Sequence, residues 1–339
     1  MSRYRWTLLK HSEQWTILRS NGEQTEAFEV QMMHENMAPV DWAETLASRL
    51  FTVGYDGSGL LMAIDSKDCL AVNVPIDPST KSNGRRAVTY ELEKYFPLPA
   101  EEFTVDYLEN PNDTFAIAVE TVNFQPLLRS LEDKGVFVQS IVPSAFIVAR
   151  SLAKQVFSSK SWDNQKDHAL LWSDIDYTEC VLFNSGNACC WYHFDKRANT
   201  LPRMLQARAA KTGRSIVVHV SDMAMPFLGA CEGCSSIIIE VIEDPPKSQI
   251  HSNSKKDFSA MVALEASEIL AGKTITSIDL CREALAATDR YRFIRRPMQF
   301  AMLGAIAILL ALRNKLIKFL AIFFQSCRRC FKFLLFFLG

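Results

Sequence analysis

The chain has 339 residues, of which 48% are hydrophobic, so it is long enough to bury the core of one large domain or of two smaller ones. Its 37 basic and 38 acidic residues are unevenly distributed: residues 313–339 carry six Lys or Arg and no acid, which leaves 31 basic against 38 acidic residues, a net charge of −7, on residues 1–312. An acidic body with a basic, apolar tail excludes nucleic acid as a partner and indicates a membrane contact at the end of the chain.

The first part of the sequence predicts strands and one helix. Strands are expected at residues 6–9 and in QWTILRSNGEQ, where Asn21-Gly22 is a strong hairpin signal. The stretch DWAETLASRLF predicts a helix, because Trp42, Leu46 and Leu50 recur at four-residue steps. Two further strands, GLLMAIDS and CLAVNVPI, follow.

A proline-containing elbow, residues 90–103 (YELEKYFPLPAEEF), joins a predicted helix to a predicted strand. The apolar residues on one face of this helix are Val88, Leu92, Tyr95 and Phe96. Pro97 cannot continue the helix, and it disfavours helical geometry at the residue before it. The strand is indicated by the alternation of Phe103, Val105 and Tyr107 with polar residues.

Helices and strands continue to alternate on both sides of a polar stretch at 158–168, which is the best internal boundary. Before it we expect the strand TFAIAVE, the helix NFQPLLRSLEDKG, the strand VFVQSIVPS and the helix AFIVARSLAKQV. After it we expect the strands ALLW, ECVLFN and ACCWYHF, helices around 200–210 and 222–230 that precede the strands SIVVHV and SIIIEVIE, and the helix FSAMVALEASEILAG. The two lobes share one pattern, which predicts an α/β protein with a duplicated plan.

The C-terminal part has a different character. Residues 297–312 are uncharged and apolar all round, unlike an amphipathic surface helix. A spanning helix needs about 20 residues, and continuation to residue 324 supplies that length. A membrane segment is therefore expected, with a buried helix, a processed tail or a re-entrant anchor as alternatives. Four arginines at 290–296 favour a cytoplasmic body, although basic residues beyond the segment weaken this orientation.

Several residue patterns suggest chemistry without assembling an active site. Gly-Lys-Thr in LAGKTIT resembles part of a phosphate loop, but this copy closes a helix and lacks the first glycine. The pairs CEGC and CRRC are each half a zinc site, so no metal is predicted, and reduced thiols are expected. Palmitoylation of Cys327 or Cys330 stays open. The six histidines are isolated in sequence, and His193 shares a strand face with Cys189 and Trp191.

Several stretches, taken in order, resemble the cytoplasmic domain shared by the type II secretion L protein and the type IV pilus M protein. LLMAIDSKDCLAVNVPI resembles the paired strands of that family, and AVTYELEKYFPLPAEEFTVDYL resembles its helix, proline elbow, acidic turn and strand. PLLRSLEDKGVFVQSIVPSAFIVARSL resembles the helix, glycine stop, strand and helix that follow. SIDLCREAL resembles the segment by which the L protein enters the inner membrane. The resemblance covers about residues 5–312.

This resemblance implies an α/β, two-lobed actin-like (ribonuclease H-like) ATPase-type fold followed by a C-terminal membrane segment. The expected parts are lobe I at 1–157, lobe II at 158–275, a basic juxtamembrane linker at 276–297, a membrane helix at 298–324 and a basic, apolar tail at 325–339. The L protein continues into a periplasmic domain, whereas this sequence ends in FKFLLFFLG. A lineage difference, a truncation and a degenerate, non-functional protein all stay open.

The resemblance also implies a function. We expect a non-enzymatic scaffold in the inner membrane, with a single membrane pass and a cytoplasmic body, that docks the assembly ATPase and small inner-membrane platform proteins of a secretion or pilus machine. A homodimer stays open. The acids of the elbow strand and its turn, Glu101, Glu102 and Asp106, are expected to be exposed and to bind a partner.

The alternative is an ATP-binding switch that uses ATP and Mg²⁺, with Asp174 and Thr178 near the phosphates. Actin-like nucleotide-binding proteins place an Asp-x-Gly turn in each lobe, and YDGSG (55–59) and SDIDYT (173–178) are the two candidates here. In the second, Asp176 occupies the glycine position, where its side chain would crowd and repel a phosphate. Both stretches are therefore interpreted as ordinary turns, and no cofactor is expected.

Overall fold

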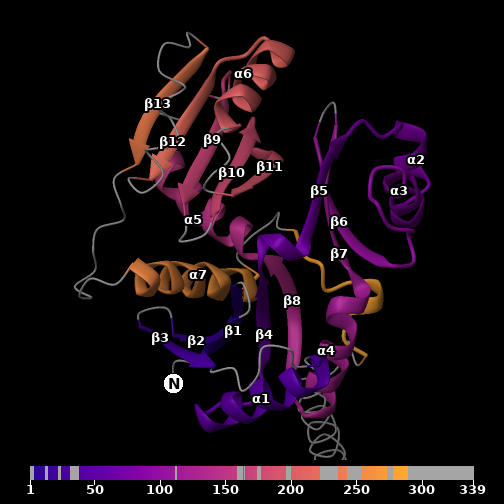
Figure 1. The fold of residues 1–339 in the computed structure, drawn as a ribbon, viewed down its shortest axis with the longest axis vertical. Helices are drawn as coiled ribbons and strands as arrows, with labels where there is room; N and C mark the ends of the chain where they lie inside the picture. Colours follow the sequence, from indigo (N-terminus) through magenta and orange to yellow (C-terminus); the bar gives the residue numbers. More distant parts are fainter. Residues whose placement is uncertain are drawn as a thin grey trace, which may run out of the picture. The chain divides into compact units, whose positions relative to one another are not determined.

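The computed structural model describes residues 4–11, 14–21, 24–30, 38–110, 113–158, 163, 165–173, 177–195, 200–221, 236–242, 254–272 and 278–288 (Figure 1). Residues 1–287 form one compact unit. The predicted membrane helix at 298–324, the tail at 325–339 and the predicted helix around 222–230 lie outside the described residues. Across the described ranges, no helix combines the length and the apolar character needed to cross a membrane.

The first lobe is built on a five-stranded sheet with the order β3-β2-β1-β4-β8. Its strands are β1 (Arg5–His11), β2 (Gln14–Ser20), β3 (Thr25–Val30), β4 (Gly59–Ile64) and β8 (Phe137–Pro143). The first three strands are antiparallel, and β4 and β8 run parallel to β1. Helices α1 (Pro39–Thr52) and α4 (Thr121–Asp133) pack together, as do α5 (Ser144–Ser158) and α7 (Ser254–Leu270) (Figure 1).

The second lobe repeats this plan with the order β11-β10-β9-β12-β13. Its strands are β9 (Asp167–Ser173), β10 (Tyr177–Asn184), β11 (Asn187–Asp195), β12 (Ile216–Ser221) and β13 (Ile237–Ile242). Again the first three are antiparallel and the last two run parallel to β9. Helix α6 (Leu201–Thr212) packs its apolar residues on one face of this sheet. The duplicated plan predicted from the sequence is therefore confirmed.

A smaller three-stranded sheet, in the order β5-β7-β6, is formed by the part of the chain that lies between β4 and β8 in sequence. It contains β5 (Cys69–Val74), β6 (Phe103–Glu109) and β7 (Thr114–Glu120), and is accompanied by α2 (Pro78–Ser82) and α3 (Arg85–Leu92). One face packs on α3, whereas Phe115, Ile117 and Val119 on the other face join the main core. The pairing of LLMAI with CLAVNV suggested by the resemblance is wrong, because β4 and β5 belong to different sheets.

The lobe boundaries differ from those expected in one respect. Helix α7 contacts β1, β2, β3, β4 and α5, so the chain returns to the first lobe after β13 and does not stay in the second up to residue 275. The contact between α5 and α7 is reinforced by Glu265, which pairs with Arg150 and Lys154. This return could not be inferred from the sequence, since an apolar helix face does not identify the sheet that it covers.

The elbow also differs in detail. Helix α3 ends at Leu92, and residues 93–102 form turns, in which Glu102 N–H donates to Pro99 O at 2.9 Å. Phe96 is buried against the Phe103 ring, with centroids 5.2 Å apart, as its spacing predicted. Tyr95 is 42% exposed, so its placement on the apolar face was wrong. The chain leaves helical geometry before Tyr95, and helical spacing then no longer fixes its direction.

Candidate functional site

The two lobes meet where their equivalent hairpins approach each other. The β1–β2 and β9–β10 strand pairs occupy the same place in the two sheets, because both sheets follow one strand order. The hydroxyl of Tyr177, the first residue of β10, lies 3.1 Å from Nδ1 of His11, the last residue of β1. Their ring centroids are 5.7 Å apart, and Tyr177 is 5% exposed. The hairpins of the two lobes are therefore in direct contact.

Other side chains of the second lobe pack around this contact. The His193 ring lies 4.6 Å from the Tyr177 ring. Glu179 is 1% exposed and accepts a hydrogen bond of 2.6 Å from Trp191 Nε1, while His193 Nδ1 lies 2.9 Å from its other oxygen. The shared strand face of Trp191 and His193 is thus confirmed. The placement of Cys189 on that face is wrong, because a register shift in the β10–β11 pairing puts Cys189 in the core of the second lobe, whereas Trp191 belongs to the main core. A buried carboxylate beside closely packed rings gives this junction an environment that disfavours a phosphate.

The predicted nucleotide residues are only partly described. Asp174 lies outside the described residues, in the β9–β10 connection. Thr178 is buried in β10, and its hydroxyl shares a hydrogen bond of 2.8 Å with the Ser173 hydroxyl across the hairpin. Thr178 does lie next to the contact between the lobes, as the alternative requires. Its hydroxyl nevertheless already has a partner within its own hairpin.

The other candidate turn, YDGSG, is not equivalent to the β9–β10 hairpin. Residues 55–58 precede β4, which begins at Gly59, and they lie beside the start of β1, since Trp6 pairs with Leu60. The Tyr55 ring meets the Trp6 ring edge to face, and Gly57 has a positive φ of 75°. The interpretation of this stretch as an ordinary turn before a strand is confirmed. The connection that does correspond, between His11 and Gln14, contains no glycine.

A continuous apolar core also joins the two lobes. It contains residues of both large sheets together with α5 and α7. Phe146 of α5 stacks on Phe115 of the small sheet at 5.7 Å and meets Trp191 of the second lobe edge to face at 5.4 Å. Moving one lobe against the other would expose these rings to water, which disfavours such a motion.

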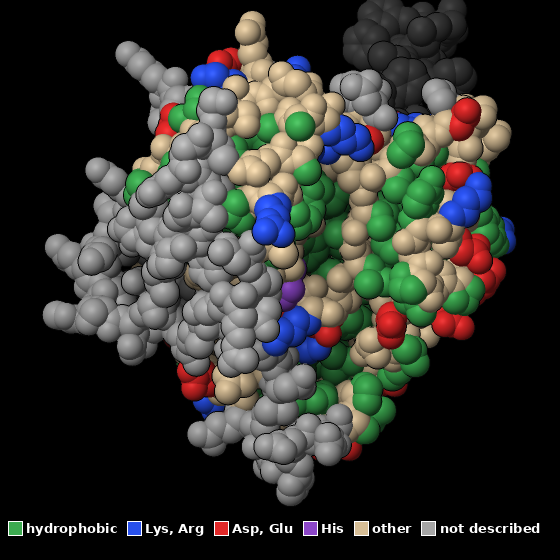
Figure 2. Space-filling model, turned by 45° about the horizontal axis from the view of Figure 1, so that its top comes forward, with side chains coloured by type: hydrophobic (Ala, Val, Ile, Leu, Met, Phe, Trp, Pro, Cys, Tyr) green, Lys and Arg blue, Asp and Glu red, His purple; other side chains and the backbone are tan. Residues whose placement is uncertain are grey.

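The elbow presents exposed side chains of mixed character. Glu101 and Glu102 are both exposed, in the turn before β6 rather than on a strand. Tyr90 and Tyr95 are 43% and 42% exposed, and the Arg86 guanidinium lies 5.7 Å from the Tyr90 ring centroid. On the right of Figure 2, hydrophobic side chains likewise lie directly beside acidic ones. Tyrosine and arginine are enriched in protein interfaces.

Asp106 is not part of this exposed surface, which corrects the expectation from the sequence. It is 4% exposed, and its carboxylate accepts from Arg85 Nη1 at 2.9 Å and from the backbone N–H of Asp279 at 2.8 Å. Arg282 Nη2 lies 3.3 Å from the same carboxylate. Asp106 therefore joins the small sheet to a segment about 170 residues later in the chain.

That segment, residues 278–287, is called the strap below. It was expected to be a linker, but it folds onto the first lobe. Leu280 N–H donates to Ile141 O at 2.8 Å, and Ile141 N–H donates to the Asp279 carboxylate at 3.0 Å, so the strap lies along β8, at one end of the first sheet. Burial raises the pKa of Asp279. Arg129 of α4 donates to the carbonyls of Ala284 and Ala286 at 3.2 and 3.1 Å.

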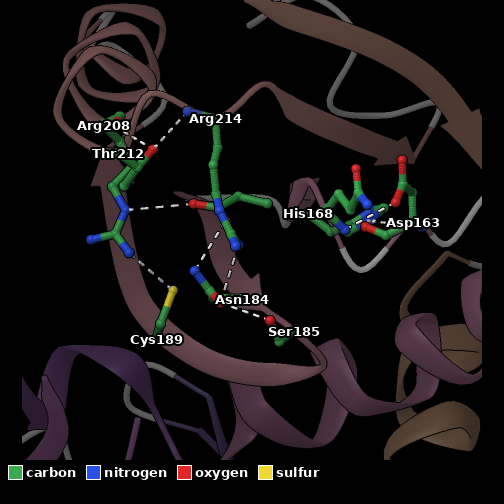
Figure 3. A network of polar contacts seen from close by, with 10 residues as sticks. Asp163, His168, Asn184, Ser185, Cys189, Arg208, Thr212 and Arg214 are labelled. Atoms are coloured by element: carbon green, nitrogen blue, oxygen red, sulfur yellow. Dashed lines mark hydrogen bonds and ion pairs between the residues drawn. The ribbon is translucent and has the colours of Figure 1, made fainter. Parts of the chain in front are cut away.

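A polar cluster in the second lobe is structural in character (Figure 3). Asp167 is fully buried, accepts from Asn184 Nδ2 at 3.1 Å, and lies 3.5 Å from Arg214 Nη1 and 3.9 Å from Arg208 Nε. Arg208 also approaches Cys189 Sγ at 3.4 Å. Burial raises the pKa of Cys189 to about 12, so its thiol stays protonated and is a poor nucleophile. The CEGC and CRRC pairs lie outside the described residues.

The sequence suggested that the histidines are isolated, but the structure brings two of them together. His168 of β9 and His219 of β12 are buried and stack with their ring planes 9° apart, and His168 Nδ1 lies 2.9 Å from His219 Nε2. Burial, with a smaller effect of His168, lowers the pKa of His219 to about 4. The sequence holds no signal for this pair, because the register of β9 against β12 brings the rings together.

Known proteins resemble this chain more clearly in structure than in sequence. No family model and no curated protein sequence matches the chain. One similar solved structure is the cytoplasmic domain of EpsL, an inner membrane component of the type II secretion system of Vibrio cholerae, with 13% identity, coverage of 84% of this chain and 100% of that chain, and a TM-score of 0.50. Another is the PilM-PilN type IV pilus biogenesis complex, with 12% identity, coverage of 81% and 100%, and a TM-score of 0.54. The chain therefore has the two-lobed actin-like fold that the sequence resemblance to these secretion and pilus proteins implied.

Proposed function

We propose that this chain is a membrane-tethered cytoplasmic scaffold of a type II secretion or type IV pilus assembly machine, and that it docks the assembly ATPase to the inner-membrane platform. The observation that supports this most is the contact between Tyr177 and His11, which joins the hairpins of the two lobes through the chain's own side chains. Lobes joined in this way keep one arrangement without a ligand. A force-generating ATPase needs a stationary partner, and lobes that keep one arrangement suit that role.

The proposed location follows from the fold relationship and the C-terminal sequence. EpsL is an inner membrane component, and the apolar residues 298–324 would supply a single membrane pass with the folded body in the cytoplasm. PilM forms a complex with PilN, which supports small platform proteins as partners of this chain. A tether raises the effective concentration of the scaffold near such partners.

We further propose that the elbow carries the ATPase-docking surface. Its exposed acids, Glu101 and Glu102, lie in the turn before β6, and the half-exposed Tyr90 and Tyr95 lie on α3 and in the turn that follows it. Apolar rings beside carboxylates suit a partner surface that combines apolar side chains with Lys or Arg. Asp106 is excluded from this surface because it is buried in ion pairs.

The rival proposal is an ATP-dependent switch with Asp174 and Thr178 near the phosphates. The position of Thr178 beside the contact between the lobes favours it. Tyr177, the neighbour of Thr178, already contacts His11 of the other lobe. The two proposals therefore differ in whether ATP and Mg²⁺ bind and in whether partner binding depends on them.

One pair of measurements separates these proposals. The full chain in detergent micelles is titrated with ATP and Mg²⁺ by calorimetry, and its binding to the assembly ATPase of the same cell is measured with and without nucleotide. The scaffold proposal expects no heat at millimolar ATP and nucleotide-independent binding. Micromolar ATP binding would support the switch, and loss of that binding in Asp174→Ala would locate it. Failure to bind the ATPase under either condition would refute the docking function.

A further inference from the structure

The strap connects three parts of the first lobe that are distant in sequence. At its start, Asp279 N–H and Arg282 contact the Asp106 carboxylate of β6. In its middle, Leu280 pairs with Ile141 of β8. At its end, the carbonyls of Ala284 and Ala286 accept from Arg129 of α4. Ten residues thus hold the small sheet, β8 and α4 together.

The strap is packed as part of the core and not as a surface loop. Ile278, Leu280 and Leu285 are 1%, 0% and 2% exposed and belong to the main core cluster. The cavity that remains between the strap and α4 measures about 10 Å³, which is room for one water molecule at most. Burying three apolar side chains makes release of part of the strap unfavourable, so its two ends are held or lost together.

The charges at the start of the strap strengthen this coupling. Asp106 is 4% exposed and has two cationic neighbours, of which Arg85 comes from α3 and Arg282 from the strap. Arg85 also donates to the carbonyl of Val105. Release of the strap would remove Arg282 and the Asp279 N–H and leave Asp106 with Arg85 as its remaining charge partner. Because a buried carboxylate is costly without its partners, strap release would also destabilise β6.

We propose that the strap couples its C-terminal end, near residue 287, to the small sheet. A displacement at Ala284–Ala286 then changes the stability of β6 through Asp106. The bound and the released strap are the two states, and both ends of the strap bias their balance. The coupling is therefore reciprocal, as any equilibrium coupling must be. It does not depend on the proposed function, but with a membrane segment downstream it would link the tether to the elbow surface.

Hydrogen exchange with mass spectrometry on the full chain in detergent micelles tests this coupling. Arg129→Gln removes the charged donor at the end of the strap. We expect about tenfold faster exchange both in the strap and in β6, Phe103–Glu109. The effect on β6 is the informative one, because Arg129 contacts the end of the strap at Ala284 and Ala286, whereas β6 contacts its start. Faster exchange in the strap alone, or unchanged exchange in both segments, would overturn the proposal.

The reverse experiment uses Asp106→Asn, which keeps an acceptor for Asp279 N–H but removes the charge. It should speed exchange at Ala284–Ala286 by a comparable factor, and exchange there at the wild-type rate would contradict reciprocity. The matched control is Arg150→Gln, which removes an arginine of the same lobe that pairs with Glu265 of α7; strap and β6 should then exchange as in the wild type.

A second readout, with a variant at an exposed position, tests the coupling in case the first variants fold poorly. The Cys281 thiol lies 3.7 Å from Val138 O and 3.6 Å from Leu285 O, so its alkylation rate reports opening of the strap. Arg282 is 44% exposed, and Arg282→Gln should be tolerated in folding while speeding alkylation of Cys281 and exchange in β6 together. Faster alkylation without faster exchange in β6 would again refute the coupling. ATPase binding is not a readout in these experiments, so their failure would leave the proposed function untouched.

Discussion

The hydroxyl of Tyr177 lies 3.1 Å from Nδ1 of His11, and this bond joins the equivalent hairpins of the two lobes. Tyr177 also packs against the His193 ring, so it contributes both a hydrogen bond and an apolar contact. A buried aromatic ring and a paired hydroxyl have separable effects on stability. Substitutions at this one position can therefore measure how firmly the lobes are joined.

Tyr177→Phe should lower the free energy of unfolding by about 1 kcal/mol, because only the hydrogen bond is lost. Tyr177→Ala should lower it by about 3 kcal/mol or more, because a cavity opens between the lobes. Urea unfolding of the full chain in detergent, followed by tryptophan fluorescence, measures both. Tyr90→Phe, at a half-exposed tyrosine of the elbow, is the control and should change stability by less than about 0.5 kcal/mol. Equal effects at the two tyrosines would contradict the role of Tyr177.

Asp106→Ala should destabilise the body by about 2 kcal/mol. The substitution leaves Arg85 and Arg282 without their shared carboxylate, and this cost is reduced because both arginines reach solvent in part. Glu102→Gln, four residues earlier and exposed, should change stability by less than about 0.5 kcal/mol. The same urea unfolding assay compares the two. A neutral Asp106→Ala would mean that the strap is not anchored through this carboxylate.

Reversal of the two exposed acids, Glu101→Lys with Glu102→Lys, should weaken binding of the assembly ATPase by about tenfold at low salt and by less at 0.5 M salt. Thermal stability should stay unchanged, since neither carboxylate is buried. Surface plasmon resonance at two salt concentrations measures the effect. Glu44→Lys, on α1, reverses another exposed charge and should leave binding intact. Equal loss in both variants would indicate a general charge effect and not a docking surface.

Stability should fall as the pH decreases from about 6.5 to about 4. The unfolded chain protonates His219 near its ordinary pKa of about 6.5, whereas burial and the neighbouring His168 lower the pKa in the folded chain to about 4. In this interval protons therefore bind preferentially to the unfolded state. Glu240 lies 3.4 Å from His219 Nδ1, but its partly exposed carboxylate does not outweigh burial.

The variant His219→Gln isolates this contribution, because it keeps a polar side chain that does not titrate. Between pH 7 and pH 4.5 the wild type should lose about 2 kcal/mol more stability than the variant. Urea unfolding at the two pH values provides the comparison, and identical pH dependence would show that His219 is not the group responsible.

Periodicity in the sequence predicted most of the strands and helices. Alternation located β9 to β11, and the four-residue recurrence of Leu46 and Leu50 located α1. The same logic failed at Asp106. Its neighbours Phe103 and Val105 alternate with it, so the opposite face of β6 was expected to meet solvent, yet the strap covers that face. Contacts between segments so far apart in sequence are not encoded in any local period.

The candidate site was less predictable than the fold. The contact between Tyr177 and His11 depends on how the two lobes pack, and the pair of His168 and His219 depends on strand register. Neither relation leaves a local pattern in a single sequence. The elbow acids Glu101 and Glu102 could be found because turns after prolines are usually exposed, and this part of the expectation holds. Their role in binding stays a prediction.

The return of the chain to the first lobe has a consequence for synthesis on the ribosome. Helix α7 and the strap complete the first lobe, but both follow β13 in sequence. All strands of the second sheet are therefore available before the first sheet receives its last helix and the cover along β8. A nascent chain that stops near residue 250 would carry a finished second sheet and an incomplete first one. The N-terminal lobe, which is translated first, is thus the last to be finished, and until then its uncovered apolar surface is open to chaperones.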